Sequence, residues 1–278
     1  MRTALTIAGS DSGGGAGIQA DLKTFAAHRV YGTSVITAVT AQNTMGVSAV
    51  EALSTDVITA QIEAVAGDFR LAAVKTGMLA NAATVEAVAA AIDTLELPNV
   101  VVDPVMVAKG GDRLLEEEAV AAVKSELLRR ALVVTPNALE AEVLAGMQVQ
   151  SLAAAREAAR RIRALGPAAV VVKGGHLPGA EAIDVLFDGH EFVEFRGPWI
   201  ETRNTHGTGC TFAAAVAANL ALGRRLRDAV ERAKSYVLGA LTAGFAVGHG
   251  HGVLDHFWNV PGAAMGRAGS EGRPASAG

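Results

Sequence analysis

Short apolar runs alternate along the chain with segments in which apolar residues recur every three or four positions. The runs have the length and the turn-residue boundaries of strands that are covered on both faces of a sheet. We predict six such strands, over residues 4–8, 34–41, 72–76, 100–103, 132–135 and 169–173.

The periodic segments between these strands predict helices. Two apolar stripes at helical spacing consist of Ile58, Ile62, Val65 and Phe69 and of Leu115, Ala119, Val123 and Leu127. Ser54 or Thr55 is placed to cap the first of these helices. A third helix is expected over residues 152–165, where Glu157 and Arg161 have a favourable spacing of four. Strands that alternate with helices indicate a mostly parallel sheet with helices on both faces.

The second half of the chain departs from this alternation. Residues 182–187 and 191–195 flank the turn sequence Asp-Gly-His at 188–190, which predicts a hairpin at an antiparallel edge of the sheet. A helix that opens on Gly-Thr-Gly-Cys at 207–210 and a further helix over 227–247 follow. We interpret residues 1–262 as one α/β domain and residues 263–278, which offer little to bury, as a disordered tail.

Composition narrows the class of protein. The 278 residues are 50% hydrophobic but only 4% aromatic, which suits parallel strands packed by alanine-rich helices. The net charge of −4 and the lack of a basic block give no support to binding of nucleic acid or of an anionic membrane. A single cysteine excludes an intramolecular disulfide and a cysteine-based zinc site, and together with the absence of a leader-like segment it predicts a cytoplasmic protein.

Segments with polar residues follow all six predicted strands, and three of these segments contain glycine. Parallel sheets bind ligands beyond the carboxyl ends of their strands, so these segments predict one built site. They begin at Gly9, Gln42, Lys75, Asp103, Thr135 and Lys173.

The first of these segments has five glycines among residues 9–17. It is not G-x-G-x-x-G, because Ile18 stands where the third glycine belongs, and it is neither a Walker A loop nor a nucleophile elbow. A dinucleotide dehydrogenase and a P-loop NTPase both lose support. We interpret the glycines as allowing the backbone to approach a ligand closely.

Cys210 follows a second glycine-rich segment at the start of an apolar helix. Backbone N–H groups at a helix start favour an anion, and a thiol in that field is expected to ionise more easily than a free one. The alternative is a glycine-rich turn with a small buried thiol, and the local sequence leaves both open.

Metal candidates are Asp103 and Glu140, which both follow strand ends and carry the hard oxygen ligands that suit Mg²⁺ beside phosphate. For either residue alone, a turn or an exposed helix start is the more ordinary interpretation. His249, His251, His256 and Asp255 could also be drawn as a metal site, but their spacing matches no known motif and we expect a loop there.

Six ordered motifs resemble the hydroxymethylpyrimidine/phosphomethylpyrimidine kinases of thiamine biosynthesis. They lie at residues 8–21, 40–44, 75–78, 103–106, 135–137 and 206–210, and the resemblance runs from about residue 3 to 260. It implies a ribokinase-like three-layer αβα sandwich. The implied activity is two successive ATP-dependent phosphorylations, first of the alcohol and then of the resulting phosphate, with ATP and Mg²⁺ as cofactors and a homodimer as the assembly.

The same resemblance implies the roles of individual residues. Gly9, Asp21, Gln42, Met78 and Val105 would contact the pyrimidine; Thr135, Asn137, Lys173, Gly207, Thr208 and Gly209 would bind ATP phosphates; Asp103 and Glu140 would hold Mg²⁺. Gln42 donates and accepts hydrogen bonds at once, which fits a ring nitrogen beside an amino group. Cys210 stands where the sugar kinases of the superfamily carry Asp, so a thiolate would have to replace a carboxylate as the base.

Two other functions compete with this one. A pyridoxal or pyridoxine kinase would share the fold and the chemistry, and Gln42 and Met78 favour the aminopyrimidine over the pyridine ring. A non-catalytic pyrimidine-binding module would lack the phosphate cradle or the carboxylates, which this chain has. We further expect the hairpin to be the place to look for a dimer contact, and residues 107–112 are a candidate loop over the substrate.

Overall fold

The computed structural model describes residues 1–106, 117–175 and 181–261. In this part of the chain nine strands form one sheet in the order β3-β2-β1-β4-β5-β6-β7-β8-β9. The strands are β1 (Thr3–Asp11), β2 (Tyr31–Gln42), β3 (Val47–Ala52), β4 (Leu71–Thr76), β5 (Val100–Val102), β6 (Val133–Val134), β7 (Ala169–Val172), β8 (Glu181–Phe187) and β9 (Phe192–Pro198). Strands β1, β2, β4, β5, β6 and β7 run parallel to one another, while β3, β8 and β9 pair antiparallel at the two edges.

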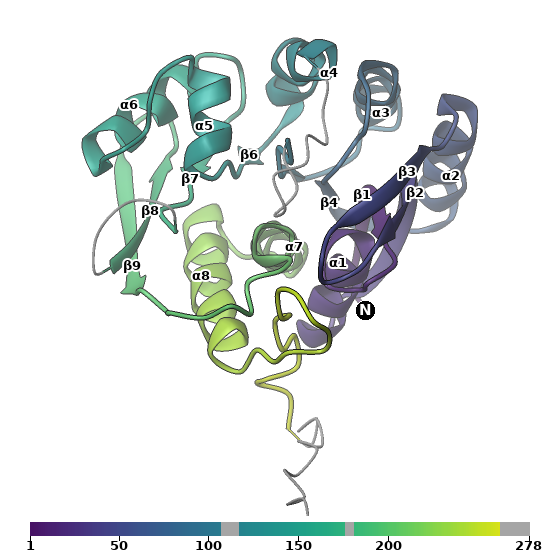
Figure 1. The fold of residues 1–278 in the computed structure, drawn as a ribbon. Coiled ribbons are helices and arrows are strands. Elements are labelled where there is room, and N and C mark those ends of the chain that lie inside the picture. Colours follow the sequence, from purple (N-terminus) through teal and green to yellow (C-terminus); the bar gives the residue numbers. More distant parts are fainter. Residues whose placement is uncertain (107–116, 176–180, 262–278) are drawn as a thin grey trace, which may run out of the picture.

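Helices cover both faces of the sheet (Figure 1). The α-helices are α1 (Gly17–Ala27), α2 (Thr55–Asp68), α3 (Ala82–Thr94), α4 (Glu117–Ala122), α5 (Ala138–Ala145), α6 (Leu152–Arg163), α7 (Thr208–Ala221) and α8 (Leu226–Thr242). Buried residues of α1, α7 and α8 form one core against the sheet, and those of α2 to α6 form a second core on the opposite face. The result is the three-layer αβα arrangement that the sequence predicted.

Helix α7 owes its central position to its composition. Every residue from Thr211 to Ala221 is buried, and most of them are alanine. Small side chains let the helix lie close to α1, to α8 and to the strands at once, so its N-terminus is fixed at the edge of the sheet. The described part of the chain contains no helix that is both long and apolar enough to cross a membrane.

The predicted elements agree with the structure with four exceptions. All six parallel strands are present, Ser54 caps α2 by accepting a hydrogen bond from the Val57 N–H, and the hairpin forms the edge pair β8–β9. Strand β3 was not predicted, because its side chains are almost all exposed and show no alternation of burial. Helix α8 ends at Thr242 rather than at 247, since Phe245 pairs its backbone with Val253.

The other two exceptions are irregular turns within the second apolar stripe. After α4 the chain widens into a π-helix over Val123–Leu127 and tightens into a 3₁₀ turn over Leu128–Arg130, so the stripe is not one regular helix. Leu115 and the predicted tail at 263–278 lie outside the described residues.

The order of the strands determines where a ligand can bind. From β1 the chain adds β2 on one side and β4 to β7 on the other. The crossover connections therefore diverge at β1 and leave a crevice beyond the carboxyl ends of the strands.

Candidate active site

A cleft of about 800 Å³ lies beyond the carboxyl ends of the parallel strands. Each of the six strands, or the segment that directly follows it, contributes at least one side chain to the lining, and these include Asp11, Gln42, Lys75, Asp103, Asn137 and Lys173. The strand ends that are far apart in the sequence therefore meet at one site, as their polar character predicted.

The N-terminus of α7 forms one wall of this cleft. Gly207 is the N-cap with φ 82°, and no side chain caps the helix. The first N–H groups of a helix have no acceptor within it, and they carry the positive end of its dipole. Gly207, Thr208, Gly209 and Cys210 all line the cleft, so this turn is a ready anion site.

The glycines of the two loops serve mainly to pack these loops together. A Cβ at Gly207 would lie 1.9 Å from the carbonyl oxygen of Gly15, and a Cβ at Gly15 would lie 2.3 Å from the His206 ring. A Cβ at Gly17 would lie 2.4 Å from the Gly9 oxygen. The interpretation that the first cluster exists for close approach to a ligand is therefore corrected: at Gly15 and Gly17 the close neighbour is the protein itself.

Asp103 and Lys173 lie beside the turn of α7. The Lys173 ammonium contacts Oδ1 of Asp103 at 3.1 Å, and a Cβ at Gly209 would lie 3.2 Å from the same ammonium. Burial lowers the pKa of Lys173, but Asp103 and Glu140 outweigh it, and the pKa lies above its ordinary value. A charged ammonium therefore lies at the anion site.

Glu140 reaches the same part of the cleft from the first turn of α5. Asn137 and Glu140 form a capping box, in which the Glu140 carboxylate accepts from the Asn137 N–H at 2.7 Å and the Asn137 side chain accepts from the Glu140 N–H at 2.9 Å. Burial, and to a lesser extent the charge of Asp103, raises the pKa of Glu140 to about 7 although Lys173 opposes this. The negative charges of Glu140 and Asp103 thus repel one another across this part of the cleft.

These carboxylates fit a magnesium ion. Oδ2 of Asp103 is buried and has no hydrogen-bond partner, which leaves one oxygen for a ligand. The described residues contain no cluster of three or more His, Cys, Asp or Glu side chains that could hold a metal alone. Mg²⁺ in phosphoryl-transfer sites binds through one or two carboxylates together with phosphate and water, so two are sufficient.

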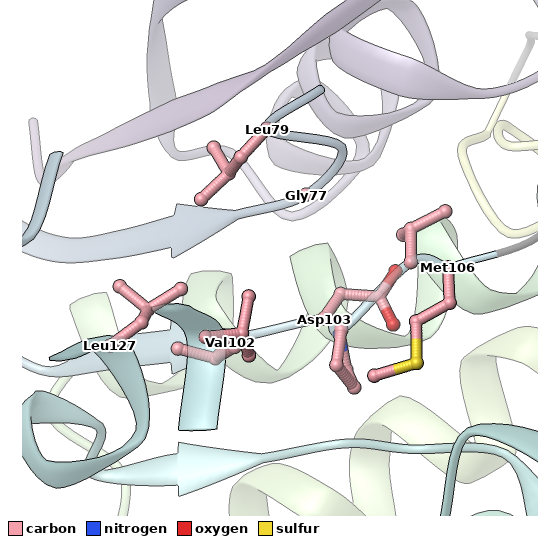
Figure 2. A pocket seen from close by; sticks show the side chains of 9 residues that line it. Gly77, Leu79, Val102, Asp103, Met106 and Leu127 are labelled. Carbon is pink, nitrogen blue, oxygen red and sulfur yellow. The ribbon is translucent and has the colours of Figure 1, made fainter. Parts of the chain in front are cut away.

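A small apolar pocket lies behind Asp103. Its volume is about 10 Å³, and Figure 2 shows Leu79, Leu127 and Met106 around it, with the Asp103 carboxylate at its rim. A space of this size and polarity holds no substrate. The pocket instead places apolar side chains against one side of Asp103, so its free oxygen is available to the cleft alone.

Lys75 and Asp21 form a fully buried ion pair at the floor of the cleft. Their charged atoms are 2.8 Å apart, and the Thr6 hydroxyl donates to the same carboxylate oxygen at 2.6 Å. Burial lowers the pKa of Lys75, but the charge of Asp21 outweighs it, so the pKa lies above its ordinary value. Lys75 lines the cleft and Asp21 does not. We expected Asp21 to contact the pyrimidine. In the structure it lies behind Lys75 and pairs with the charge of that lysine.

Thr135 is a second correction. Its side chain is completely buried, it donates weakly to the Val102 carbonyl, and it does not line the cleft. We expected Thr135 to bind ATP phosphate. Its position does not fit this role, because it directly follows β6 and its side chain lies in the core. The other expected site residues do line the cleft: Gly9, Gln42, Met78, Val105, Asp103, Asn137, Glu140, Lys173 and residues 207–210.

Cys210 lies at the third position of α7, but its thiol does not ionise easily. Burial raises its pKa to about 12, and the nearby Lys75 charge only partly offsets this. The structure therefore does not support a readily ionised thiol, because loss of water and the charges of Asp103 and Asp21 outweigh Lys75 and the backbone N–H of Gly17. Cys210 is a half-buried thiol that lines the cleft.

The two ends of the cleft differ in character. At one end Gln42 lies near His206, and the methyl group of Met78 lies over Gly9, where a Cβ would be 2.3 Å from it. At the other end the lining is apolar and partly exposed, with Leu139, Val143, Pro198, Trp199, Val237 and Leu238 among its members. A polar aromatic ring fits the first end and a larger flat base fits the second.

Among the described residues, His249, His251, His256 and Asp255 do not form a group that could hold a metal ion. His256 is buried, accepts or donates a 3.0 Å contact with Thr211 and has its pKa lowered to about 4 by burial. His249 and His251 lie in an exposed loop, where His251 donates its backbone N–H to Thr44. The loop at 107–112 that we considered as a cover for the substrate lies outside the described residues.

Among the cleft residues to which the sequence analysis assigned no role are Asp11, Lys75 and His206, although each lies in one of the six motifs. Lys75 was detectable as a charged residue at the end of an otherwise apolar strand. Asp11 begins a run of turn glycines, which is typical of a side chain that accepts backbone N–H groups. His206 gave no local signal, because its partners are distant in the sequence.

Comparison with known proteins decides the family. The sequence profile of the family described as phosphomethylpyrimidine kinase matches residues 11–255. The chain belongs to this family. A hydroxymethylpyrimidine/phosphomethylpyrimidine kinase of Bacillus subtilis is 51% identical over 255 residues, which cover 91% of this chain and 94% of that protein.

Solved structures of the family and of pyridoxal kinases have the same fold. A phosphomethylpyrimidine kinase of Clostridium difficile is 42% identical with a TM-score of 0.77, and the match covers 86% of this chain and 98% of that one. A pyridoxal kinase of Staphylococcus aureus, solved in complex with AMP-PCP and pyridoxal, is 34% identical with a TM-score of 0.87, covering 94% and 95%.

Proposed function

We propose that this protein phosphorylates 4-amino-5-hydroxymethyl-2-methylpyrimidine with ATP, first to the monophosphate and then to the diphosphate, in thiamine diphosphate biosynthesis. The observation that carries the proposal is the uncapped N-terminus of α7 beside Lys173 and Asp103, in a cleft whose other polar end contains Gln42. Relatives at 51% and 52% identity bear the corresponding name.

ATP phosphates would bind at the turn of α7. The backbone N–H groups of residues 207–210 would stabilise charge as it develops on the transferred phosphoryl group, and Lys173 and Asn137 would hold the neighbouring phosphate oxygens. The adenine would occupy the apolar end of the cleft. Such a site works mainly by position and charge, because phosphoryl transfer demands little covalent chemistry from the protein.

Asp103 and Glu140 would hold Mg²⁺. The ion would neutralise part of the negative charge of the phosphates. The free buried oxygen of Asp103 and the raised pKa of Glu140 support this assignment, because both indicate a site that favours an additional cation.

The pyrimidine would bind at the end of the cleft that contains Gln42. The side-chain amide of Gln42 can pair with a ring nitrogen and the adjacent amino group, and Met78 and Val105 would contact the ring faces. The hydroxymethyl group would then point toward the turn of α7 and toward Cys210.

Cys210 would accept the hydroxymethyl proton in the first transfer. To accept that proton Cys210 must already be a thiolate, which burial opposes and the positive charge of Lys75 favours, and it becomes a neutral thiol as the oxygen attacks the phosphoryl group. In the second transfer the acceptor is already an anion and needs no base. The two steps therefore place different demands on one thiol.

One assay tests the proposed function: ATP turnover with hydroxymethylpyrimidine, with its monophosphate and with pyridoxal as acceptors. We expect turnover with both pyrimidines. Tight pyrimidine binding without turnover of any acceptor would contradict the proposal and favour a binding module.

Pyridoxal is the second acceptor to consider. Pyridoxal kinases of Bacillus subtilis and Staphylococcus aureus share the fold at 41% and 34% identity, each with a TM-score of 0.87. We expect kcat/KM for pyridoxal to be lower than that for the pyrimidine, because Gln42 matches an aminopyrimidine edge. A higher kcat/KM for pyridoxal would make pyridoxal the main substrate and phosphorylation of the pyrimidine the side activity.

A homodimer in the cytoplasm completes the proposal. The family resemblance supports the dimer, and the lone cysteine supports a reducing compartment. Light scattering of the purified protein measures the oligomeric state directly.

A further inference from the structure

Asp11 is the centre of a network that no catalytic role above uses. It is the last residue of β1, and its side chain is 3% exposed. Oδ1 accepts from the N–H of Gly13 at 2.8 Å, while Oδ2 accepts from the N–H groups of Gly15 and Ala16 at 3.1 and 2.8 Å. The same Oδ2 lies 2.8 Å from Nε2 of His206.

This contact to His206 joins two loops that are 195 positions apart in the sequence. Residues 11–17 lead into α1, and residues 205–207 lead into α7. Next to the contact, the carbonyl of Gly15 lies so close to Gly207 that a Cβ there would be 1.9 Å away. The Asp11–His206 contact therefore closes a tight interface between the starts of two helices.

The charge on Asp11 strengthens this closure. Burial alone would raise the pKa of Asp11, but the His206 side chain and the N–H groups of Ala16 and Gly13 outweigh it, so the pKa lies below its ordinary value. Asp11 is thus a carboxylate at neutral pH. Hydrogen bonds to a charged acceptor are shorter and about twice as strong as neutral ones.

The placement of the turn of α7 depends on this closure together with the hydrogen bond from the Thr208 hydroxyl to the Thr205 carbonyl at 2.7 Å. Gly207 has a left-handed backbone and α7 has no side-chain cap. On the other side, the His206 N–H donates to the Gly252 carbonyl at 3.1 Å, so the residue is held from both directions. The direction of the N–H groups at 207–210 then follows from where His206 is fixed.

We propose that Asp11 and His206 are positioning residues for phosphoryl transfer, which hold the N-terminal turn of α7 against the 11–17 loop in its catalytic orientation. Gln42 lies beside this pair, with its Nε2 atom 3.5 Å from Nε2 of His206, so the pair borders the pyrimidine end of the cleft as well as the anion site. The inference rests on the proposed function, in that the turn of α7 is the place where the phosphoryl group is transferred.

Three variants test the pair. Asp11→Asn keeps the shape and one acceptor oxygen but removes the charge and part of the Oδ2 contacts. His206→Ala removes the partner, and His206→Gln restores a side-chain N–H that can donate to Asp11. The matched control is Asp188→Asn, because the Asp188 carboxylate also accepts two backbone N–H groups, at 2.8 and 2.9 Å, but in an exposed turn far from the cleft lining.

The measurements separate positioning from folding. For each variant we measure kcat and KM with hydroxymethylpyrimidine and with its monophosphate, the Kd of hydroxymethylpyrimidine without nucleotide, and the Kd of ADP with aluminium fluoride as a mimic of the transferred group. The melting temperature shows whether each variant is folded.

We expect Asp11→Asn and His206→Ala to lower kcat for both transfers by about 10²-fold, the cost typical of a displaced catalytic geometry. Binding of ADP–aluminium fluoride should weaken in parallel, while the Kd of hydroxymethylpyrimidine changes by less than about threefold. His206→Gln should recover most of kcat, and Asp188→Asn should resemble the wild type.

Other outcomes overturn the inference. If folded variants keep kcat, or if melting temperature falls while kcat per folded molecule stays constant, the pair is structural only. If His206→Gln is as inactive as His206→Ala, the hydrogen bond to Asp11 is not what matters. A wild-type protein that phosphorylates no pyrimidine would instead contradict the proposed function, which keeps the two failures distinct.

Discussion

At the scale of single residues, the cleft contains charged groups whose state depends on their partners. Lys173 and Lys75 keep their charge because a carboxylate faces each of them. Cys210 has no such anionic role in the ground state, since burial raises its pKa to about 12. Substitution of a paired lysine should therefore affect stability, whereas substitution of the neutral Cys210 thiol should affect kcat.

Replacing the thiol separates the two transfers. We expect Cys210→Ala to lower kcat for hydroxymethylpyrimidine by about 10²-fold, the low end for general-base catalysis, because with a pKa of about 12 only a small fraction of Cys210 is the thiolate that can accept a proton. With the monophosphate as acceptor, kcat should stay within about threefold of wild type, since that acceptor is already an anion. Steady-state kinetics with each acceptor measures both values.

Equal losses in the two steps would assign Cys210 to the shape of the anion site instead. Because Cys210 is the one cysteine of the chain, its alkylation by iodoacetamide adds an independent test. The rate should still be rising with pH above pH 9, since the thiolate forms only near its raised pKa.

The buried pair under the cleft is expected to matter for stability. Lys75→Met should lower the free energy of unfolding by about 3–5 kcal/mol, because Asp21 is left as a buried charge without a partner. The double variant Lys75→Met/Asp21→Leu should recover most of this loss. Urea denaturation measures all three proteins.

An exposed ion pair provides the control for this prediction. Arg196 and Glu181 are 2.9 Å apart but about half exposed, so Arg196→Met should cost less than about 1 kcal/mol. If the double variant were as unstable as the single one, the uncompensated charge would not be the cause, and loss of packing at Lys75 would be.

At the scale of elements, α7 has a glycine with a left-handed backbone at each end. Gly207 precedes it with φ 82° and Gly223 follows it with φ 83°. A Cβ at Gly207 would collide with the Gly15 carbonyl, whereas a Cβ at Gly223 would meet nothing within 4 Å. The two positions therefore share backbone strain and differ only in the clash.

This pair of glycines gives a matched experiment. Gly207→Ala should reduce kcat by about 10²-fold or more, because the 11–17 loop and the turn of α7 must move apart. Gly223→Ala should cost about 1–2 kcal/mol of stability from backbone strain and leave kcat unchanged. Kinetics and urea denaturation of both variants measure the two effects, and a full kcat in folded Gly207→Ala would show that the close contact of the loops is dispensable.

At the scale of the whole molecule, the sequence predicted the parallel sheet and its convergent strand ends because those depend on local pattern. Buried strands are short apolar runs, and the polar residue after each run falls at one edge of the sheet. Strand β3 escaped detection because it is exposed, and the Asp11–His206 contact escaped because it joins distant segments. Thr135 and Asp21 were assigned to the cleft by resemblance, but which way a side chain points depends on packing that no motif records.

The cleft extends across the carboxyl edge of the whole sheet, so ligands at its two ends should stabilise the fold separately. At a hundredfold excess over its Kd, AMP-PCP with Mg²⁺ or hydroxymethylpyrimidine should each add about 2.7 kcal/mol to the free energy of unfolding, by mass action. Thermal unfolding with each ligand and with both measures these gains as shifts in melting temperature. Gly207→Ala should lose the shift from AMP-PCP and keep that from the pyrimidine, because only the phosphate end is displaced, while Gly223→Ala should keep both. A pyrimidine shift that disappears in Gly207→Ala would place the ring beside the turn of α7 and not beside Gln42.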